Sequence, residues 1–145
     1  MLKLNFPSFE FRLKNRNNKS YIFDIIRKKF ILLTPEEWVR QHVINYLINH
    51  RVSKNHINVE RKIVINKLTK RFDVVVFKRD GSVKLLVECK APNIKIDQKV
   101  FDQISIYNKS LSAEFMMITN GLVHFFFKIN NSTKTYNFIK EFPLK

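Results

Sequence analysis

Cysteine is almost absent from this chain, because Cys89 is the only one among 145 residues. A single cysteine excludes an internal disulfide and any zinc site built from several cysteines. No apolar run approaches the ~20 residues that a membrane-spanning helix needs. The N-terminus interleaves Lys, Glu and Arg with apolar residues instead of forming the core of a signal peptide. These absences predict a cytoplasmic protein.

Acidic residues are also scarce, since 12 Asp and Glu stand against 27 Lys and Arg, for a formal net charge of +15. Such an excess favours a polyanionic partner, because neutralising phosphates releases condensed counterions and adds affinity. Nucleic acid is the predicted partner, although ribosomal or membrane-surface association would explain the charge equally well. The four histidines have no metal-ligand spacing and receive no predicted role: His42, His50, His56 and His124.

Two runs rich in β-branched and aromatic residues stand on either side of Asp80-Gly81, within residues 70–92. Asp-Gly is typical of a two-residue hairpin turn, because both residues tolerate a positive φ. The sequence therefore predicts a β-hairpin in which Asp73 lies opposite Glu88. The same register places Phe77 opposite Lys84 and assigns the other face to Phe72, Val74, Val76, Leu85, Val87 and Cys89.

Side chains alternate along a strand, so Glu88 and Lys90 share one face of this hairpin, and Asp73 joins them there. Directly opposed Cβ atoms lie about 4.5–5.5 Å apart, and two carboxylates in that position destabilise a sheet unless a cation compensates. A divalent cation between Asp73 and Glu88 would do so. The alternative is a solvated face, or a carboxylate pair that Arg71 and Lys90 neutralise.

A helix is predicted over residues 34–49, because Thr34 can cap it, Pro35 suits its first position and Glu37 follows the cap by three residues. Ahead of it, residues 2–13 and 21–26 predict a β-hairpin with a turn at 15–18. A strand is expected at 57–65, where Glu60 is either an edge charge or an acid near a metal. Further on, the patterns predict a helix at 97–110 and strands at 114–119, 122–129 and 134–139, with Asn120-Gly121 as a type I′ turn.

Asp73 followed by Glu88-Cys89-Lys90 resembles the signature of the PD-(D/E)xK nucleases. The order of motifs along the chain is similar to the N-terminal nuclease domain of type I restriction enzyme R subunits. The chain departs from the pattern at Phe72, which stands where the signature has proline. The resemblance rests on Thr34-Pro35-Glu36-Glu37-Trp38-Val39-Arg40-Gln41, Glu88-Cys89-Lys90-Ala91-Pro92, Gln103, Tyr107-Asn108 and Thr119-Asn120-Gly121.

The resemblance implies an α/β, restriction-endonuclease-like fold of three layers, with a mixed sheet flanked by helices, and the order of elements allows it. We expect a single domain over residues 1–145, with an N-terminal β extension at 1–33 and a nuclease core at 34–145. A chain of this length supports one domain. The resemblance therefore covers the nuclease module and no helicase motor.

The resemblance also implies a metal site that hydrolyses phosphodiester bonds. Asp73, Glu88 and the backbone carbonyl of Cys89 would bind Mg²⁺ or Mn²⁺, which prefer hard oxygen ligands. Lys90 would position the attacking water or stabilise charge on phosphorus. The first turn of the helix would supply a third acid, for which the resemblance favours Glu37, although Glu37 also suits a capping box and Glu36 is the alternative.

Six residues are predicted to contact nucleic acid. The resemblance suggests Gln103 and Tyr107, which stand four apart on a helix, although an ordinary helix edge would look the same. Arg40 and Gln41 would orient the third acid or touch phosphate. The basic run before the helix contributes Lys28 and Lys29.

These residues predict a Mg²⁺-dependent DNA endonuclease of the type I restriction R-subunit kind. The alternative is a non-catalytic nucleic-acid-binding module or a subunit of a restriction or repair complex. A role on RNA is a third hypothesis. DNA is the expected partner, together with a second copy of the chain or the subunits of a restriction complex, and no membrane.

Overall fold

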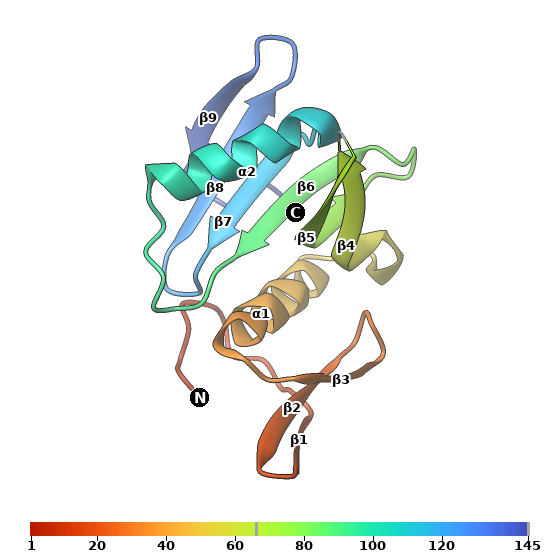
Figure 1. The fold of residues 1–145 in the computed structure, drawn as a ribbon, viewed down its shortest axis with the longest axis vertical. Helices are drawn as coiled ribbons and strands as arrows, with labels where there is room; N and C mark the ends of the chain where they lie inside the picture. Colours follow the sequence, from red (N-terminus) through yellow and green to blue (C-terminus); the bar gives the residue numbers. More distant parts are fainter. Residues whose placement is uncertain (66, 145) are drawn as a thin grey trace.

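The chain forms two β-sheets and two long helices in a computed structural model that describes residues 1–65 and 67–144 (Figure 1). The first sheet is N-terminal and the second is the central sheet of the molecule. A short 3₁₀ turn, Lys54–His56, precedes the central sheet. The elements are β1 (Leu13–Arg16), β2 (Lys19–Asp24), β3 (Lys29–Leu32), α1 (Pro35–Asn49), β4 (Ile57–Ile65), β5 (Leu68–Phe77), β6 (Val83–Cys89), α2 (Gln98–Leu111), β7 (Phe115–Thr119), β8 (His124–Asn130) and β9 (Thr135–Ile139).

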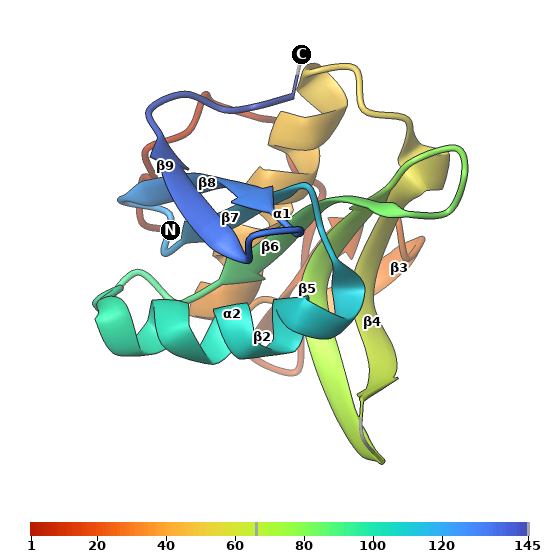
Figure 2. The ribbon, with the colours of Figure 1, turned by 90° about the horizontal axis from the view of Figure 1, so that it is seen from above.

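The central sheet has the strand order β4-β5-β6-β7-β8-β9. Its neighbours pair antiparallel except β6 and β7, which are parallel because α2 connects them across the sheet. Figure 2 shows α1 on one face of this sheet and α2 on the other. The expected mixed sheet between helices is thus confirmed, and so is the presence of an N-terminal β extension.

Both helices begin where the sequence signals predict. The Thr34 side chain accepts a hydrogen bond from the Glu37 N–H at the start of α1, with Pro35 in the first turn. Asp97 caps α2 in the same way through the Val100 N–H. Within the described residues, neither helix is long and apolar enough to cross a membrane.

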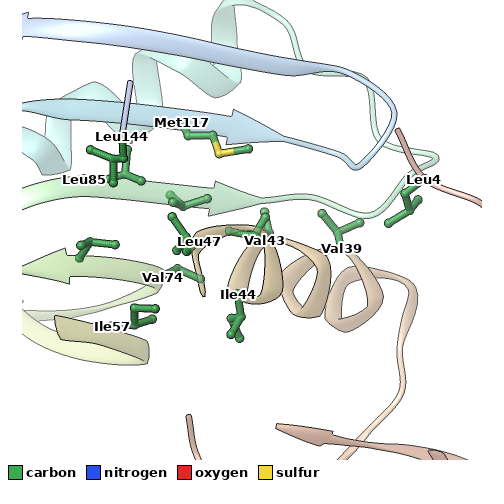
Figure 3. Close-up of a cluster of buried hydrophobic side chains, with 13 residues drawn as sticks. Leu4, Val39, Val43, Ile44, Leu47, Ile57, Val74, Leu85, Met117 and Leu144 are labelled. Carbon is green, nitrogen blue, oxygen red and sulfur yellow. The ribbon is translucent and has the colours of Figure 1, made fainter. Parts of the chain in front are cut away.

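Two apolar cores lie on opposite faces of the central sheet. The first core joins α1 to the sheet through Val39, Val43 and Leu47, which pack with Val74 and Leu85 (Figure 3). The second core joins α2 to the other face, and its buried members include Val75, Leu86, Ile104, Met116 and Ile118. Because both faces of β5 and β6 are covered, polar side chains on these strands lie in surroundings where burial is costly.

The N-terminal sheet has three strands in the order β1-β2-β3, all antiparallel. The predicted turn at residues 15–18 is present, and Asn17 and Asn18 have φ values of 52° and 63°. The prediction of a strand over residues 2–13 was wrong, because the first strand starts only at Leu13. The third strand, β3, lies where the sequence patterns gave no strand.

The turn of the β5–β6 hairpin differs from the predicted two-residue turn. The Lys78 N–H donates to the Ser82 carbonyl, and Gly81 has a φ of 89°, so three residues form the loop. The register shifts between Val76 and Phe77, and Phe77 pairs with Val83 instead of Lys84. Such a β-bulge leaves one residue unpaired, and farther from the turn the predicted register holds for Val74–Val87, Val75–Leu86 and Val76–Leu85.

Phe72 was predicted on the same face as Val74 and Val76, but it packs in the second core. Ile63 on β4 joins it there, whereas Ile57 and Val59 belong to the first core. Between them, Glu60 has a φ of 56°, which interrupts the regular alternation of the strand. Figure 2 shows one end of the β4–β5 ribbon extending past α2.

The Asn120-Gly121 turn is also longer than predicted. Thr119 pairs with His124, so residues 120–123 form the loop and β8 starts at His124. Asn120 Oδ1 accepts from the N–H groups of Leu122 and Val123, which replaces the expected type I′ geometry. Gly121, with a φ of 86°, lets the loop approach Leu4, whose Cδ2 would lie 2.9 Å from an added Cβ.

Candidate functional site

Strands β5 and β6 separate directly after the Val74–Val87 pair. Beyond that pair, β5 continues along β4, while β6 continues along β7. The Asp73 side chain lies in the resulting gap and accepts a hydrogen bond of 2.8 Å from the Cys89 N–H through Oδ2. A carboxylate thus takes the place of a backbone acceptor, and Asp73 is held by the neighbouring strand. We call this place the strand gap.

Glu88 lies beside Asp73 at the strand gap and is 8% exposed. Burial, followed by the charge of Asp73, raises the pKa of Glu88 to about 8. Lys70 and Lys90 act in the opposite direction through their charges. The two buried carboxylates therefore share an electrostatic cost, but they do not lie opposite each other in the strand ladder as predicted, because the pairing of β5 with β6 ends at Val74–Val87.

Two lysines border this carboxylate pair. Lys90 Nζ lies 3.9 Å from Glu88 Oε1, and the Lys90 side chain is 28% exposed. Lys70 Nζ lies 4.8 Å from the centre of the Tyr107 ring on α2. Tyr107 therefore contacts a cation that acts on Glu88.

Arg40 of α1 brings a third cation into direct contact with the site. Its Nη2 donates to Asp73 Oδ1 and lies 2.8 Å from Glu60 Oε1 and 3.2 Å from Glu36 Oε2. Its Nη1 donates to Glu37 Oε1 at 2.6 Å. Burial opposes the charge of Arg40, but the charges of Asp73 and Glu37 outweigh it and raise the pKa of the guanidinium above its usual range.

The two candidate helix acids have different surroundings. Glu37 is buried and accepts hydrogen bonds from Arg27, Arg40 and Gln41. The Glu36 side chain is 47% exposed, and burial together with the charge of Asp73 raises its pKa. The charge of Asp73 in the strand gap therefore acts on Glu36, whereas the carboxylate of Glu37 is occupied by hydrogen bonds within the protein.

Glu37 belongs to a chain of contacts that links the N-terminal sheet to the site. The buried carboxylate of Asp24 accepts from Arg27 Nε at 2.7 Å and from Gln41 Nε2 at 2.9 Å. Arg27 Nη2 donates to Glu37 Oε2 at 2.7 Å. We call the five charged residues Asp24, Arg27, Glu37, Arg40 and Asp73 the buried ion network. It joins β2, α1 and β5.

The residues predicted to contact nucleic acid are distributed over three places. Lys28 and Lys29 are exposed at the turn between β2 and β3. Gln41 is fully buried and makes the orienting contact with Glu37, at 3.0 Å. Gln103 is exposed on α2, while Tyr107 is partly buried against the second core.

The sequence did not predict most contacts of the buried ion network. Asp24 received no predicted role, because a lone acid in a charged turn carries no signal, and Arg27 was considered only as part of the basic run with Lys28 and Lys29 that could face phosphate. Glu60 was flagged, and its contact with Arg40 follows from the positive φ that turns the strand at this residue. Lys70 also received no predicted role, although its charge acts on Glu88. Asn120 has a supporting role, since its Nδ2 donates to the Ile94 carbonyl in the loop that follows Lys90.

The side chains of the strand gap do not form a complete metal cage. Within residues 1–65 and 67–144, no three His, Cys, Asp or Glu side chains are grouped so that they could hold a metal ion. Cys89 is buried, and burial raises the pKa of its thiol, so its sulfur is unsuited to binding a metal as a thiolate. The oxygen donors are therefore a pair of carboxylates and the backbone near them.

Comparison with known families gives the class of the protein. The family model for the N terminus of the type I restriction enzyme R protein matches residues 35–143. This match covers most of the chain, and the chain belongs to that family. Residues 1–34, with the N-terminal sheet, lie outside the match.

A solved structure supports the fold. The chain is similar to a fragment described as the HsdR subunit of a type I restriction enzyme from Vibrio vulnificus YJ016, with a TM-score of 0.53 and 22% identity. The similarity covers 77% of this chain and 24% of the other, so the present chain spans about a quarter of that solved chain. The search of curated proteins gave no match.

Proposed function

We propose that this domain is a Mg²⁺-dependent endonuclease that hydrolyses phosphodiester bonds in DNA within a type I restriction enzyme. The observation that carries the proposal is the strand gap, where Asp73 and Glu88 lie together and Lys90 lies 3.9 Å from Glu88. A purely electrostatic phosphate binder would gain nothing from two buried acids among so many cations. Membership in the R-protein family supports DNA and the other restriction subunits as partners.

The donor set fits Mg²⁺ or Mn²⁺. Asp73 and Glu88 offer carboxylate oxygens, and the Cys89 carbonyl is proposed as a third ligand. Magnesium is usually held by one or two carboxylates, with waters and substrate phosphates completing its shell. A site with two acidic side chains and no complete cage matches that pattern. The raised pKa of Glu88 also fits, since a cation would remove the repulsion that causes part of the shift.

When bound, the metal ion supplies a water of lowered pKa and neutralises charge that develops at the scissile phosphate. The protein residues then have separate roles. Asp73 and Glu88 hold the ion, and Lys90 positions the attacking water or stabilises negative charge on phosphorus. Glu36, which is half exposed and senses the charge of Asp73, is the better candidate for the third acid, because Glu37 is occupied by two arginines and a glutamine.

Arg40 is proposed as a positioning residue and not as a contact to DNA phosphate. Its guanidinium holds Oδ1 of Asp73 while the Cys89 N–H holds Oδ2. Each carboxylate oxygen has two lone pairs, so both oxygens keep capacity for a metal ion. A ligand fixed on both oxygens is preorganised, which reduces the cost of ordering it during binding.

The test measures cleavage of plasmid and linear duplex DNA with Mg²⁺ and with EDTA. We expect Mg²⁺-dependent cleavage by the wild type and its loss in Asp73→Asn and in Lys90→Ala, because each variant removes a group at the strand gap. Asn at position 73 preserves an acceptor for the Cys89 N–H and limits the risk of unfolding. Retained cleavage by both variants would reject the assignment.

Matched controls separate this effect from a general change of charge. Asp102→Ala removes an exposed acid on α2, and Lys128→Ala removes an exposed lysine on β8. Both should keep wild-type cleavage. Thermal melting of all variants shows whether a loss of activity comes with a loss of folding.

A non-catalytic nucleic-acid-binding module is the second candidate, and the position of Arg40 favours it. A guanidinium in contact with Asp73 already supplies a positive charge to that carboxylate. In this case, calorimetry should detect no Mg²⁺ or Mn²⁺ binding that Asp73→Asn abolishes. Metal binding that depends on Asp73 would decide for the endonuclease.

A further inference from the structure

The N-terminal sheet is amphipathic, and its two faces differ in character. Pairing across β1, β2 and β3 places Ile22 and Asp24 on one face, and both are fully buried toward α1. Figure 1 shows this sheet on the side of α1 that is remote from the central sheet. The opposite, outer face follows from the same register and holds Arg12, Lys14, Arg16, Lys19, Tyr21, Phe23, Phe30 and Leu32.

Four cations stand on this outer face, and all four are exposed. Among the residues that the structure describes, none of the four forms an ion pair with an acid: Arg12, Lys14, Arg16 and Lys19. The only acids that precede Glu36 in the chain are Glu10 and Asp24, and Asp24 is occupied by Arg27 and Gln41. The outer face is therefore a positive surface with little internal compensation.

Aromatic rings hold part of this charge in place. The Arg12 guanidinium lies 4.4 Å from the centre of the Phe23 ring, and Lys14 Nζ lies 4.7 Å from that of Phe30. Phe23 and Phe30 pair across the strands and contact each other edge to face, with centres 5.3 Å apart. Side chains two residues apart on β1 repeat about every 6.8 Å, so the cations form a row of fixed spacing.

We propose that the outer face of the N-terminal sheet binds the phosphate backbone of duplex DNA, as a second contact surface outside the region matched by the family. The choice of DNA rests on the proposed function, and the surface itself rests on the row of unpaired cations. The buried ion network fixes this sheet to α1 and thereby to Asp73. A duplex held by the sheet is thus held in a defined orientation to the strand gap.

The rings favour a duplex over a single strand. Proteins that bind single strands stack bases on free aromatic faces. Here Phe23 and Phe30 are partly buried, and cations already lie over them. The surface therefore offers positive charge to a phosphate backbone but little aromatic area on which unpaired bases could stack. These properties suit duplex DNA, in which the bases are paired inside the double helix.

The test is a binding measurement in EDTA, where no metal-dependent cleavage takes place. A labelled duplex of about 30 bp is titrated with the full chain at several salt concentrations. We expect Lys14→Glu/Arg16→Glu to weaken binding at least ~10-fold and to reduce the salt slope by about 2, because two phosphate contacts are lost. Lys14→Gln/Arg16→Gln should weaken binding in the same direction by a smaller factor.

The matched control is Lys128→Glu/Lys140→Glu, which makes the same change of charge on exposed residues at β8 and after β9. It should weaken binding by less than ~3-fold, because only the long-range field changes. Equal weakening by the two double variants would overturn the proposal. A single strand that competes better than the duplex, and loses this advantage in the Lys14/Arg16 variant, would overturn the choice of duplex.

The binding test of the N-terminal sheet can fail or succeed independently of the cleavage test of the strand gap. If Asp73→Asn and Lys90→Ala both retained cleavage, the catalytic assignment would fail, but duplex binding in EDTA would still report on the sheet. If the sheet variants bound normally while Asp73→Asn lost cleavage, only the second surface would be rejected.

Discussion

The strand gap and the outer face of the N-terminal sheet use charge in opposite ways. At the strand gap, Asp73 and Glu88 are almost completely buried, and Arg40 contacts four acids. On the outer face, the four cations are exposed, and two of them, Arg12 and Lys14, lie over aromatic rings. One region orders a few charges in an apolar setting, and the other spreads charges on a surface in water.

The difference follows from the dielectric environment. Charges that are removed from water interact strongly and must be paired, so each member of the buried ion network should matter for folding. Exposed charges are screened and contribute little to stability, yet they remain available to an external polyanion. The gap therefore suits the proposed chemistry, and the outer face suits the proposed electrostatic binding.

The largest expected effect is a loss of folding stability, which should differ strongly between variants of Arg40 and Arg16. Replacing Arg40 with Met should reduce the free energy of unfolding by about 3–5 kcal/mol, because acids in the interior lose their counter-charge. Replacing Arg16 with Met should change it by less than ~0.5 kcal/mol. Urea denaturation of both variants measures this. Equal effects at the two positions would contradict the contrast between the regions.

A second effect is a pH dependence that belongs to the gap. The pKa of Glu88 is raised by burial and by Asp73 to about 8, above its ordinary value of 4.5. A folded state that holds this proton more tightly is most stable below about pH 4.5 and loses the contribution as the pH rises through about 8.

In EDTA, the free energy of unfolding of the wild type relative to Glu88→Gln should therefore fall between pH 5 and pH 9, by on the order of 3 kcal/mol. Urea denaturation across the pH range tests it. The same pH dependence in the wild type and in Glu88→Gln would show that the carboxylates are not coupled in this way.

The two helix acids give a third comparison. Glu37→Gln should destabilise the protein by about 2 kcal/mol, because Glu37 binds Arg27 and Arg40. Glu36→Gln should reduce the rate of cleavage about 10- to 100-fold with almost no change of stability. Cleavage assays and melting curves on both variants decide between them. A loss of cleavage only in Glu37→Gln, without destabilisation, would favour Glu37 as the third acid.

The smallest effect concerns the outer face. Arg12→Ala removes the guanidinium over Phe23 and should cost about 0.5–1 kcal/mol, as exposed cation–π contacts do. Chemical denaturation with Leu2→Ala as an exposed control gives the value. A cost of several kcal/mol would mean that Arg12 supports the fold and is less available to a ligand.

Local patterns in the sequence predicted much of the fold. The cap at Thr34, the apolar pattern over residues 97–110 and the alternation from Ile57 to Ile65 placed two helices and a strand within one residue of their observed bounds. These signals depend on neighbours in the chain, which the sequence contains. The turns at Gly81 and Gly121 were recognised, but their loop lengths were not, because Asn120 binds its own loop and a β-bulge shifts the register at Phe77.

The arrangement of charges could not be read in the same way. The sequence indicated that Asp73, Glu88 and Lys90 belong together, because one hairpin contains all three. It did not indicate that Arg40 enters the gap or that Glu37 turns toward Arg27, since these contacts connect a helix to two different sheets.

By itself, the sequence determined the elements, the hairpin acids and the excess of positive charge, which are properties of short segments and of composition. Only the tertiary structure decided which acids face the gap, which are neutralised and which cations remain in water. The physical reason is that burial and distance set the energy of a charge, and both arise only when separate elements pack against one another.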